Sequence, residues 1–261
     1  MNRRIFLGLT TALALLPLSA FAQDKLPVVA SFSILGDMVA EVGGDRVAVS
    51  TLVGPDGDAH VYEPTPADAQ TVAAASVVFV NGLGFEGWLD RLIEASEYKG
   101  PVVVATTGVV PRAMAEEGHD HDHAGHAEGE AKAEGEADHD HDHAHEGHDH
   151  GGIDPHAWQS LANARLYVAN IAAGLTAADP EGAETYKANA AAYLAEIDAV
   201  EAEIIAAVAA LPEDRRSVVT SHDAFGYFGA TYGLTFHAPE GISTESEASA
   251  ADVATLITQI K

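Results

Sequence analysis

The chain has 261 residues, of which 47% are hydrophobic, so it can form one large domain or two modest ones with a packed core. Its formal net charge of −27 argues against a nucleic-acid partner, because neutralising phosphates requires a basic surface. It contains no cysteine, which excludes disulfides and thiolate metal sites, so a metal would be bound by imidazole, carboxylate or water.

The N-terminus has the pattern of an export signal. Arg3-Arg4 precedes a largely apolar stretch over residues 5–19, and Ala20-Phe21-Ala22 is a small-x-small cleavage site. At about 15 residues this stretch is shorter than the roughly 20 that a membrane span needs. We therefore predict a signal peptide over residues 1–22 and a soluble periplasmic protein starting at Gln23, exported by the general or the twin-arginine route.

Strand-like and helix-like segments alternate in the first part of the mature chain. We expect strands at residues 28–32, 47–53, 76–80 and 102–105. We expect helices at residues 34–42, from residue 65 onward and at residues 85–96. Ser33 is the expected cap of the first helix, and Thr65-Pro66 is a typical helix start. The alternation predicts an N-terminal α/β lobe with a parallel sheet over residues 23–115.

The composition then changes sharply. Residues 116–150 contain ten of the 14 histidines and thirteen aspartates or glutamates, with almost nothing large and apolar. Such a segment cannot offset the entropy cost of ordering. We predict a disordered loop over residues 116–152, with His-Asp-His repeats that can chelate Zn²⁺ in many weak arrangements.

A long helix is the next feature. After an expected helix at residues 158–175, which ends the N-terminal lobe (153–178), Asp179-Pro180 starts a second helix with Asp179 as its cap. An apolar repeat at helical spacing continues to Pro212, which predicts about 30 residues and a length of ~45 Å. We interpret residues 179–211 as a linking helix between two lobes; the alternative is a helix packed along one domain.

The strand and helix alternation restarts after this helix. We expect strands at residues 217–220 and 234–237. We expect helices at residues 224–232 and 248–260. Because only about two strands follow the long helix, we predict that residues 212–261 are a partial C-terminal lobe of a longer protein. The predicted fold class is α/β, with two lobes of parallel sheet flanked by helices and joined by one long backbone helix.

Four histidines lie outside the histidine-rich loop. His60, His156 and His222 lie where a strand or turn gives way to a helix, which is where ligands bind in open α/β sheets. One such histidine alone is more typical of a surface or capping residue. Three imidazoles without a thiolate suit Zn²⁺ better than Mn²⁺. His237 ends a strand without such a junction, and we expect it not to bind metal.

The stretches around the three histidines resemble the zinc-specific solute-binding proteins of ABC transporters, the ZnuA-type family. The matching stretches are residues 57–66, 154–158 and 220–228, in this order and with a histidine-rich insert after the first. The resemblance implies two α/β lobes, a long backbone helix, and a metal bound in the cleft by His60, His156 and His222. It also implies a non-enzymatic function: high-affinity capture of periplasmic Zn²⁺ as the transported ligand, by a monomer.

The resemblance further implies that the zinc is delivered to an ABC permease in the inner membrane, powered by a cytoplasmic ATPase. In manganese-binding relatives a glutamate matches His222. Some zinc-binding members have a glutamate ligand where this chain has Ala59, and others take an aspartate from the C-terminal lobe. The fourth ligand is therefore unassigned; water or a carboxylate beyond residue 261 fits better than Asp58 or Glu63.

Three other functions are compatible with a histidine-rich metal protein. One is a manganese or iron carrier of the same fold, and another is a zinc buffer acting only through the loop. The third is a zinc hydrolase, although the sequence has no His-Glu-x-x-His helix. For a carrier, affinity should fall as the pH drops through the histidine range near ~6.5, because protons compete for imidazole.

Overall fold

The computed structural model describes residues 24–113, 152–239, 244, 254 and 256–258. The predicted signal peptide, nearly all of the predicted loop at 116–152 and most of the predicted helix at 248–260 lie outside these residues. Among the described helices, none has the length and apolarity needed to cross a membrane.

A four-stranded sheet forms the centre of the N-terminal lobe. Its strands are β1 (Leu26–Phe32), β2 (Val47–Val53), β3 (Val77–Val80) and β4 (Val102–Val104), in the order β2-β1-β3-β4. All three pairings are parallel, as predicted. Every residue of Val28–Phe32 is buried, which is typical of a central parallel strand covered on both faces.

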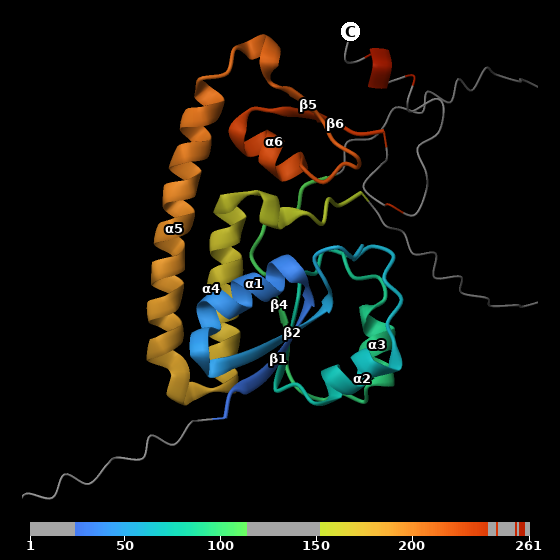
Figure 1. The fold of residues 1–261 in the computed structure, drawn as a ribbon, viewed down its shortest axis with the longest axis vertical. Helices are drawn as coiled ribbons and strands as arrows, with labels where there is room; N and C mark the ends of the chain where they lie inside the picture. The colour runs from blue at the N-terminus through green and yellow to red at the C-terminus, as the bar shows by residue number, and fades with distance from the viewer. Residues whose placement is uncertain (1–23, 114–151, 240–243, 245–253, 255, 259–261) are drawn as a thin grey trace, which may run out of the picture.

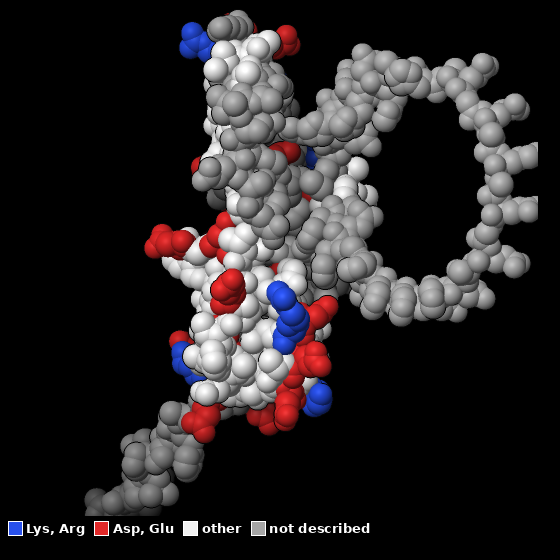
Figure 2. All heavy atoms as spheres, turned by 90° about the vertical axis from the view of Figure 1, so that its right-hand side faces the viewer, with Lys and Arg blue, Asp and Glu red and all other residues white. Residues whose placement is uncertain are grey.

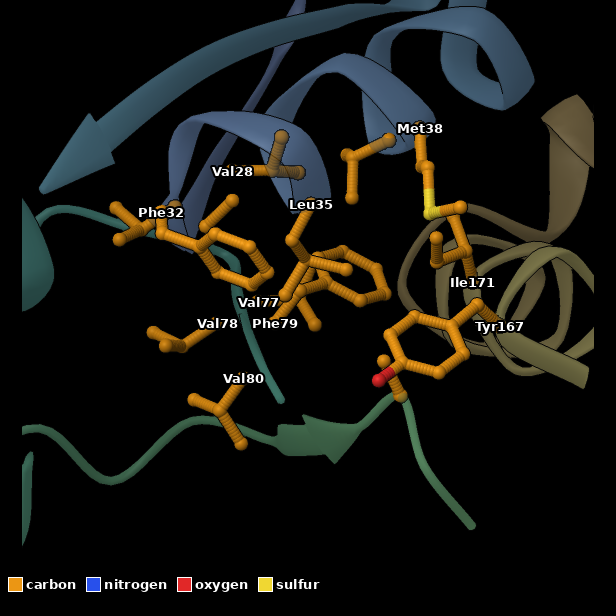
Figure 3. Packing of buried hydrophobic residues seen from close by; sticks show 14 of the residues in the cluster. Val28, Phe32, Leu35, Met38, Val77, Val78, Phe79, Val80, Tyr167 and Ile171 are labelled. Carbon is orange, nitrogen blue, oxygen red and sulfur yellow. The ribbon is translucent and has the colours of Figure 1, made fainter. Parts of the chain in front are cut away.

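Helices cover both faces of this sheet. They are α1 (Ser33–Gly43), α2 (Pro66–Ala73), α3 (Leu89–Ala95) and α4 (Leu161–Ala178). In Figure 1, α1 and α4 lie on one side of the sheet, and α2 and α3 lie on the other. The core between α1, α4 and the sheet contains Leu35, Phe79, Tyr167 and Ile171, which are fully buried and face one another in Figure 3.

Helix α5 (Ala183–Ala209) has 27 residues and is therefore about 40 Å long. It contacts α1 and α4 of the N-terminal lobe and α6 of the C-terminal lobe, so it runs beside both, as Figure 1 shows. The predicted cap is wrong: Asp179 makes no capping bond. Its carboxylate instead accepts hydrogen bonds from Arg46 (2.7 Å) and Tyr186 (2.6 Å), and a 3-10 turn, η3 (Pro180–Gly182), precedes the helix.

The described part of the C-terminal lobe is small. A 3-10 turn, η4 (Glu213–Arg215), follows α5. Strands β5 (Ser217–Val219) and β6 (Thr235–His237) then pair in parallel, and α6 (Gly226–Tyr232) connects them. The predicted fold class is thus confirmed: parallel sheets flanked by helices, with one long helix beside both lobes. The predicted domain boundaries stay predictions.

Three predicted helix starts are wrong. Helix α1 already includes Ser33, and the extended Phe32 takes the cap position without a side-chain bond. Helix α3 begins at Leu89 rather than residue 85, because the Glu86 carboxylate turns back to accept hydrogen bonds from the backbone of Asn81 (2.6 Å) and Gly82 (3.1 Å). Helix α4 begins at Leu161 rather than residue 158, because Ser160 is extended and a separate 3-10 turn, η2 (Ala157–Gln159), comes before it.

The surface reflects the acidic composition. Figure 2 shows acidic side chains spread over the visible face, with basic ones at isolated positions among them.

Candidate metal centre

His60 lies in the loop between β2 and α2. Its backbone N–H donates to the Asp58 carboxylate (2.9 Å), and the Trp88 indole donates to the Ala59 carbonyl (2.8 Å). Helix α2 then begins with a capping box, in which Thr65 and Asp68 each accept a hydrogen bond from the other's backbone. The loop is therefore fixed on both sides of the imidazole.

His156 lies in a buried turn just before η2. The Asn81 side chain, which follows β3, donates to the Pro155 carbonyl (2.9 Å). Asp154 accepts from the His156 backbone and lies 2.9 Å from the ring Nδ1. His156 is 2% exposed, so both its ring and its supporting carboxylate are removed from bulk water.

His222 follows β5 and precedes α6. Its ring is half-buried, and its carbonyl accepts a hydrogen bond from the Thr220 hydroxyl (3.0 Å). The ring centroid lies 5.9 Å from that of His60 and 5.5 Å from that of His156. The C-terminal lobe thus presents its histidine to the two from the N-terminal lobe.

The three histidines form one cluster. Each offers a ring nitrogen, and the three nitrogens lie within 4.8 Å of one another; the Nε2 atoms of His60 and His156 are 3.1 Å apart. No aspartate, glutamate or cysteine of the described residues joins this group. Converging lone pairs on neutral imidazoles are a donor set that a divalent cation could bind.

Aromatic side chains wall the cluster. The ring of Phe85 lies 4.9 Å from that of His60, and the ring of Trp158 lies 5.3 Å from that of His156, between centroids. Phe85 and Trp158 also contact each other. An apolar wall strengthens electrostatic interactions at the nitrogens because it excludes water.

The environment keeps His60 neutral. Burial, with the neighbouring His156 and His222 rings, lowers its pKa to about 4, against the opposing effect of Asp58. This ring therefore stays unprotonated, as a metal ligand must be, to a lower pH than a free imidazole does.

The remaining candidates lie outside the cluster. His237 ends β6, where its carbonyl accepts from the Thr220 backbone (3.0 Å). Neither Asp58 nor Glu63 contributes an oxygen to the group of three nitrogens. Asp58 instead accepts hydrogen bonds from the His60 backbone and the Thr244 hydroxyl.

Sequence reasoning missed the residues that support the cluster. Asn81, directly after the strand β3, is fully buried, donates to the Pro155 carbonyl and accepts from the Tyr167 hydroxyl (2.5 Å). Glu86 was assigned to a helix, yet it is a buried carboxylate that also accepts from Ser31 (2.6 Å). The available signal was a polar residue directly after an apolar strand, which in a parallel sheet lies at the ligand-binding edge.

Comparison with known proteins identifies the family. The model of the family ZnuA, zinc-uptake complex component A, periplasmic, matches residues 28–261. The chain belongs to the ZnuA family. This membership confirms the resemblance at the level of a periplasmic metal-binding protein, without deciding the metal.

Relatives of this ZnuA-family chain are named for several metals. It is 36% identical to the manganese-binding lipoprotein MntA of Halalkalibacterium halodurans, over 81% of this chain and 59% of MntA. It is 30% identical to the iron ABC transporter substrate-binding lipoprotein MtsA of Streptococcus pyogenes, over 92% of this chain and 69% of MtsA. The periplasmic zinc-binding protein TroA of Treponema pallidum has a similar structure, with a TM-score of 0.72 at 26% identity over 90% of this chain and 74% of TroA.

Proposed function

We propose that this chain captures Zn²⁺ in the periplasm with His60, His156 and His222. The observation that supports zinc is the donor set: three imidazole nitrogens within 4.8 Å, with no carboxylate of the described residues among them. All-nitrogen sites of this kind suit Zn²⁺, whereas Mn²⁺ prefers more oxygen. A fourth ligand would complete a tetrahedral site.

The same proposal includes delivery of the zinc to an ABC importer. Membership of the ZnuA family and the name of MtsA, an ABC transporter substrate-binding lipoprotein, support this role. The partners would be an inner-membrane permease and its cytoplasmic ATPase. The chain would act by binding and release rather than by catalysis, and it would do so as a monomer.

A manganese or iron carrier is the second candidate. The names of MntA and MtsA favour it, and both share at least 30% identity with this chain. A manganese carrier would require a different donor set, because Mn²⁺ prefers more oxygen ligands than Zn²⁺ does, whereas imidazole suits both zinc and iron. A hydrolase is less well supported, because it would need a carboxylate that acts as general base. The carboxylate of Asp154 is instead hydrogen-bonded to Nδ1 of His156.

Competition titration decides between these metals. We expect the tight site of the full chain to bind Zn²⁺ at least ~100-fold more tightly than Mn²⁺, in line with the order of divalent affinities and the ligand set. A chelator of known affinity sets the scale for each metal. Tighter binding of Mn²⁺ than of Zn²⁺ would establish the manganese carrier instead.

Variants of the cluster separate the cleft site from a buffer that acts only through the loop. We expect the double variant His60→Ala, His222→Ala to lose the tight site and keep only weak zinc binding, measured by the same titration. His237→Ala is the matched control, because it removes a histidine of the same lobe outside the cluster. A tight site that survives in the double variant would point to the loop.

The histidine-rich segment would gather zinc for the cleft. Ala113 and Ile153 pair in an antiparallel bridge, and the Asp154 N–H donates to the Arg112 carbonyl (2.9 Å). The segment therefore leaves and rejoins the described chain at adjacent points, three residues before His156. A tether fixed at both ends near the cleft raises the effective concentration of any zinc that the segment holds. The alternative is a solvated linker with incidental affinity.

A further inference from the structure

We propose that Asp154 is a positioning residue that sets the tautomer and orientation of His156 for metal binding, and that Gly226 of the opposite lobe leaves the space that its carboxylate occupies. This inference rests on the proposed function, because it assumes that His156 binds the metal.

One carboxylate oxygen of Asp154 makes two bonds to the same histidine. Asp154 Oδ1 accepts from the His156 backbone N–H and lies 2.9 Å from the ring Nδ1. With Asp154 as the acceptor of this contact, Nδ1 carries the proton and Nε2 carries the lone pair. That lone pair faces the cluster, where Nε2 of His156 lies 3.1 Å from Nε2 of His60.

The other carboxylate oxygen packs against the C-terminal lobe. A Cβ added to Gly226, the first residue of α6, would lie 2.5 Å from Asp154 Oδ2 and 2.9 Å from Arg112 Nε. Only a glycine therefore leaves room for the carboxylate at this position. Arg112 also links the lobes, because its backbone N–H donates to the Tyr227 hydroxyl (2.9 Å).

The hydrogen bond between Asp154 and Nδ1 of His156 is shielded from water. Asp154 is 2% exposed, so water cannot replace the Nδ1 bond if the carboxylate is removed or displaced. A carboxylate on the far nitrogen fixes a ligating imidazole and raises its basicity, and loss of such a partner usually costs ~10–100-fold in metal affinity. The affinity of the cleft would thus depend on a residue that does not touch the metal.

Asp154→Asn is the direct test, with Asp223→Asn as the matched control. Both changes remove one carboxylate charge next to the cluster, but Asp223 is adjacent to His222 and has no bond to the His156 ring. The readouts are competition titration of the full chain with Zn²⁺ at neutral pH, the tautomer of His156 from long-range ¹H–¹⁵N NMR, and the melting temperature without metal.

We expect Asp154→Asn to weaken zinc binding ~10–100-fold and to change the Nδ1 signal of His156, with less than ~3-fold change for Asp223→Asn. Equal weakening by both variants, or wild-type affinity of Asp154→Asn, would overturn the positioning role. A metal-free melting temperature that falls as far as that of a core variant such as Leu35→Ala would assign Asp154 a structural role instead.

Gly226→Ala tests the contribution of the opposite lobe. It leaves all charges in place but puts a methyl group where Asp154 Oδ2 lies, so we expect a similar shift of the His156 signal and weaker zinc binding. An unchanged signal and affinity would refute the contact. His156→Ala identifies a failure of the proposed function itself, because undiminished zinc binding in that variant would mean that the histidine is not a ligand.

Discussion

At the scale of single residues, the candidate centre depends on side chains that are distant in sequence. His60 and His156 are separated by 96 positions, yet their Nε2 atoms lie 3.1 Å apart. Burial, and then the nearby His156 ring, hold the pKa of His60 low, so its imidazole stays neutral and able to bind a cation. The metal preference then follows from the identity of each donor.

His222 is the position at which we expect the metal preference to change. His222→Glu replaces an imidazole with a carboxylate, so we expect the ratio of Zn²⁺ to Mn²⁺ affinity to fall at least ~10-fold. The ratio is measured by competition titration of both metals. His237→Glu is the control, since the same substitution outside the cluster should leave the ratio unchanged; an unchanged ratio in His222→Glu would contradict the ligand assignment.

The motifs that resemble the ZnuA-type family predicted which histidines gather, but not what holds them. The junction before a helix that each of His60, His156 and His222 occupies did not decide this by itself. Asn81 and Asp154 act through contacts with residues far along the chain or inside a turn, and no periodicity marks them. Their roles depend on burial, which only the folded chain defines.

At the scale of elements, the start of α2 is the local structure that holds the His60 loop. Thr65→Ala removes the capping box, so we expect the free energy of unfolding to fall by about 1 kcal/mol. Chemical denaturation without metal measures this change. Thr71→Ala in the same helix is the control, because its hydroxyl only bonds the Ala67 carbonyl within the helix. An equal effect of both variants would show that the cap contributes nothing specific.

Strands were predicted better than helix starts. The strand at residues 47–53 was predicted at its observed bounds, because its composition is set by burial in the sheet. The start of α3 was wrong because Glu86 accepts hydrogen bonds from Asn81 and Ser31, and the cap predicted for α5 was wrong because Asp179 accepts from Arg46 and Tyr186. A local cap signal cannot compete with a buried partner elsewhere in the fold.

At the scale of the whole molecule, α5 runs beside both lobes. The residues on either side of the histidine-rich segment, Ala113 and Ile153, pair with each other. Deleting residues 116–150 should leave the cleft site with its tight affinity but lower the number of weakly bound zinc ions. Zinc uptake by cells at limiting zinc should fall as well. Unchanged stoichiometry and unchanged uptake would show that the segment is a linker with incidental affinity.

The most direct test of the central claim is anomalous diffraction at the zinc absorption edge from crystals of the protein grown with Zn²⁺. We expect one strong anomalous peak bounded by the imidazoles of His60, His156 and His222, at zinc–nitrogen distances of about 2.0–2.1 Å, together with the fourth ligand. A strong peak elsewhere, with no peak among these three rings, would contradict the account.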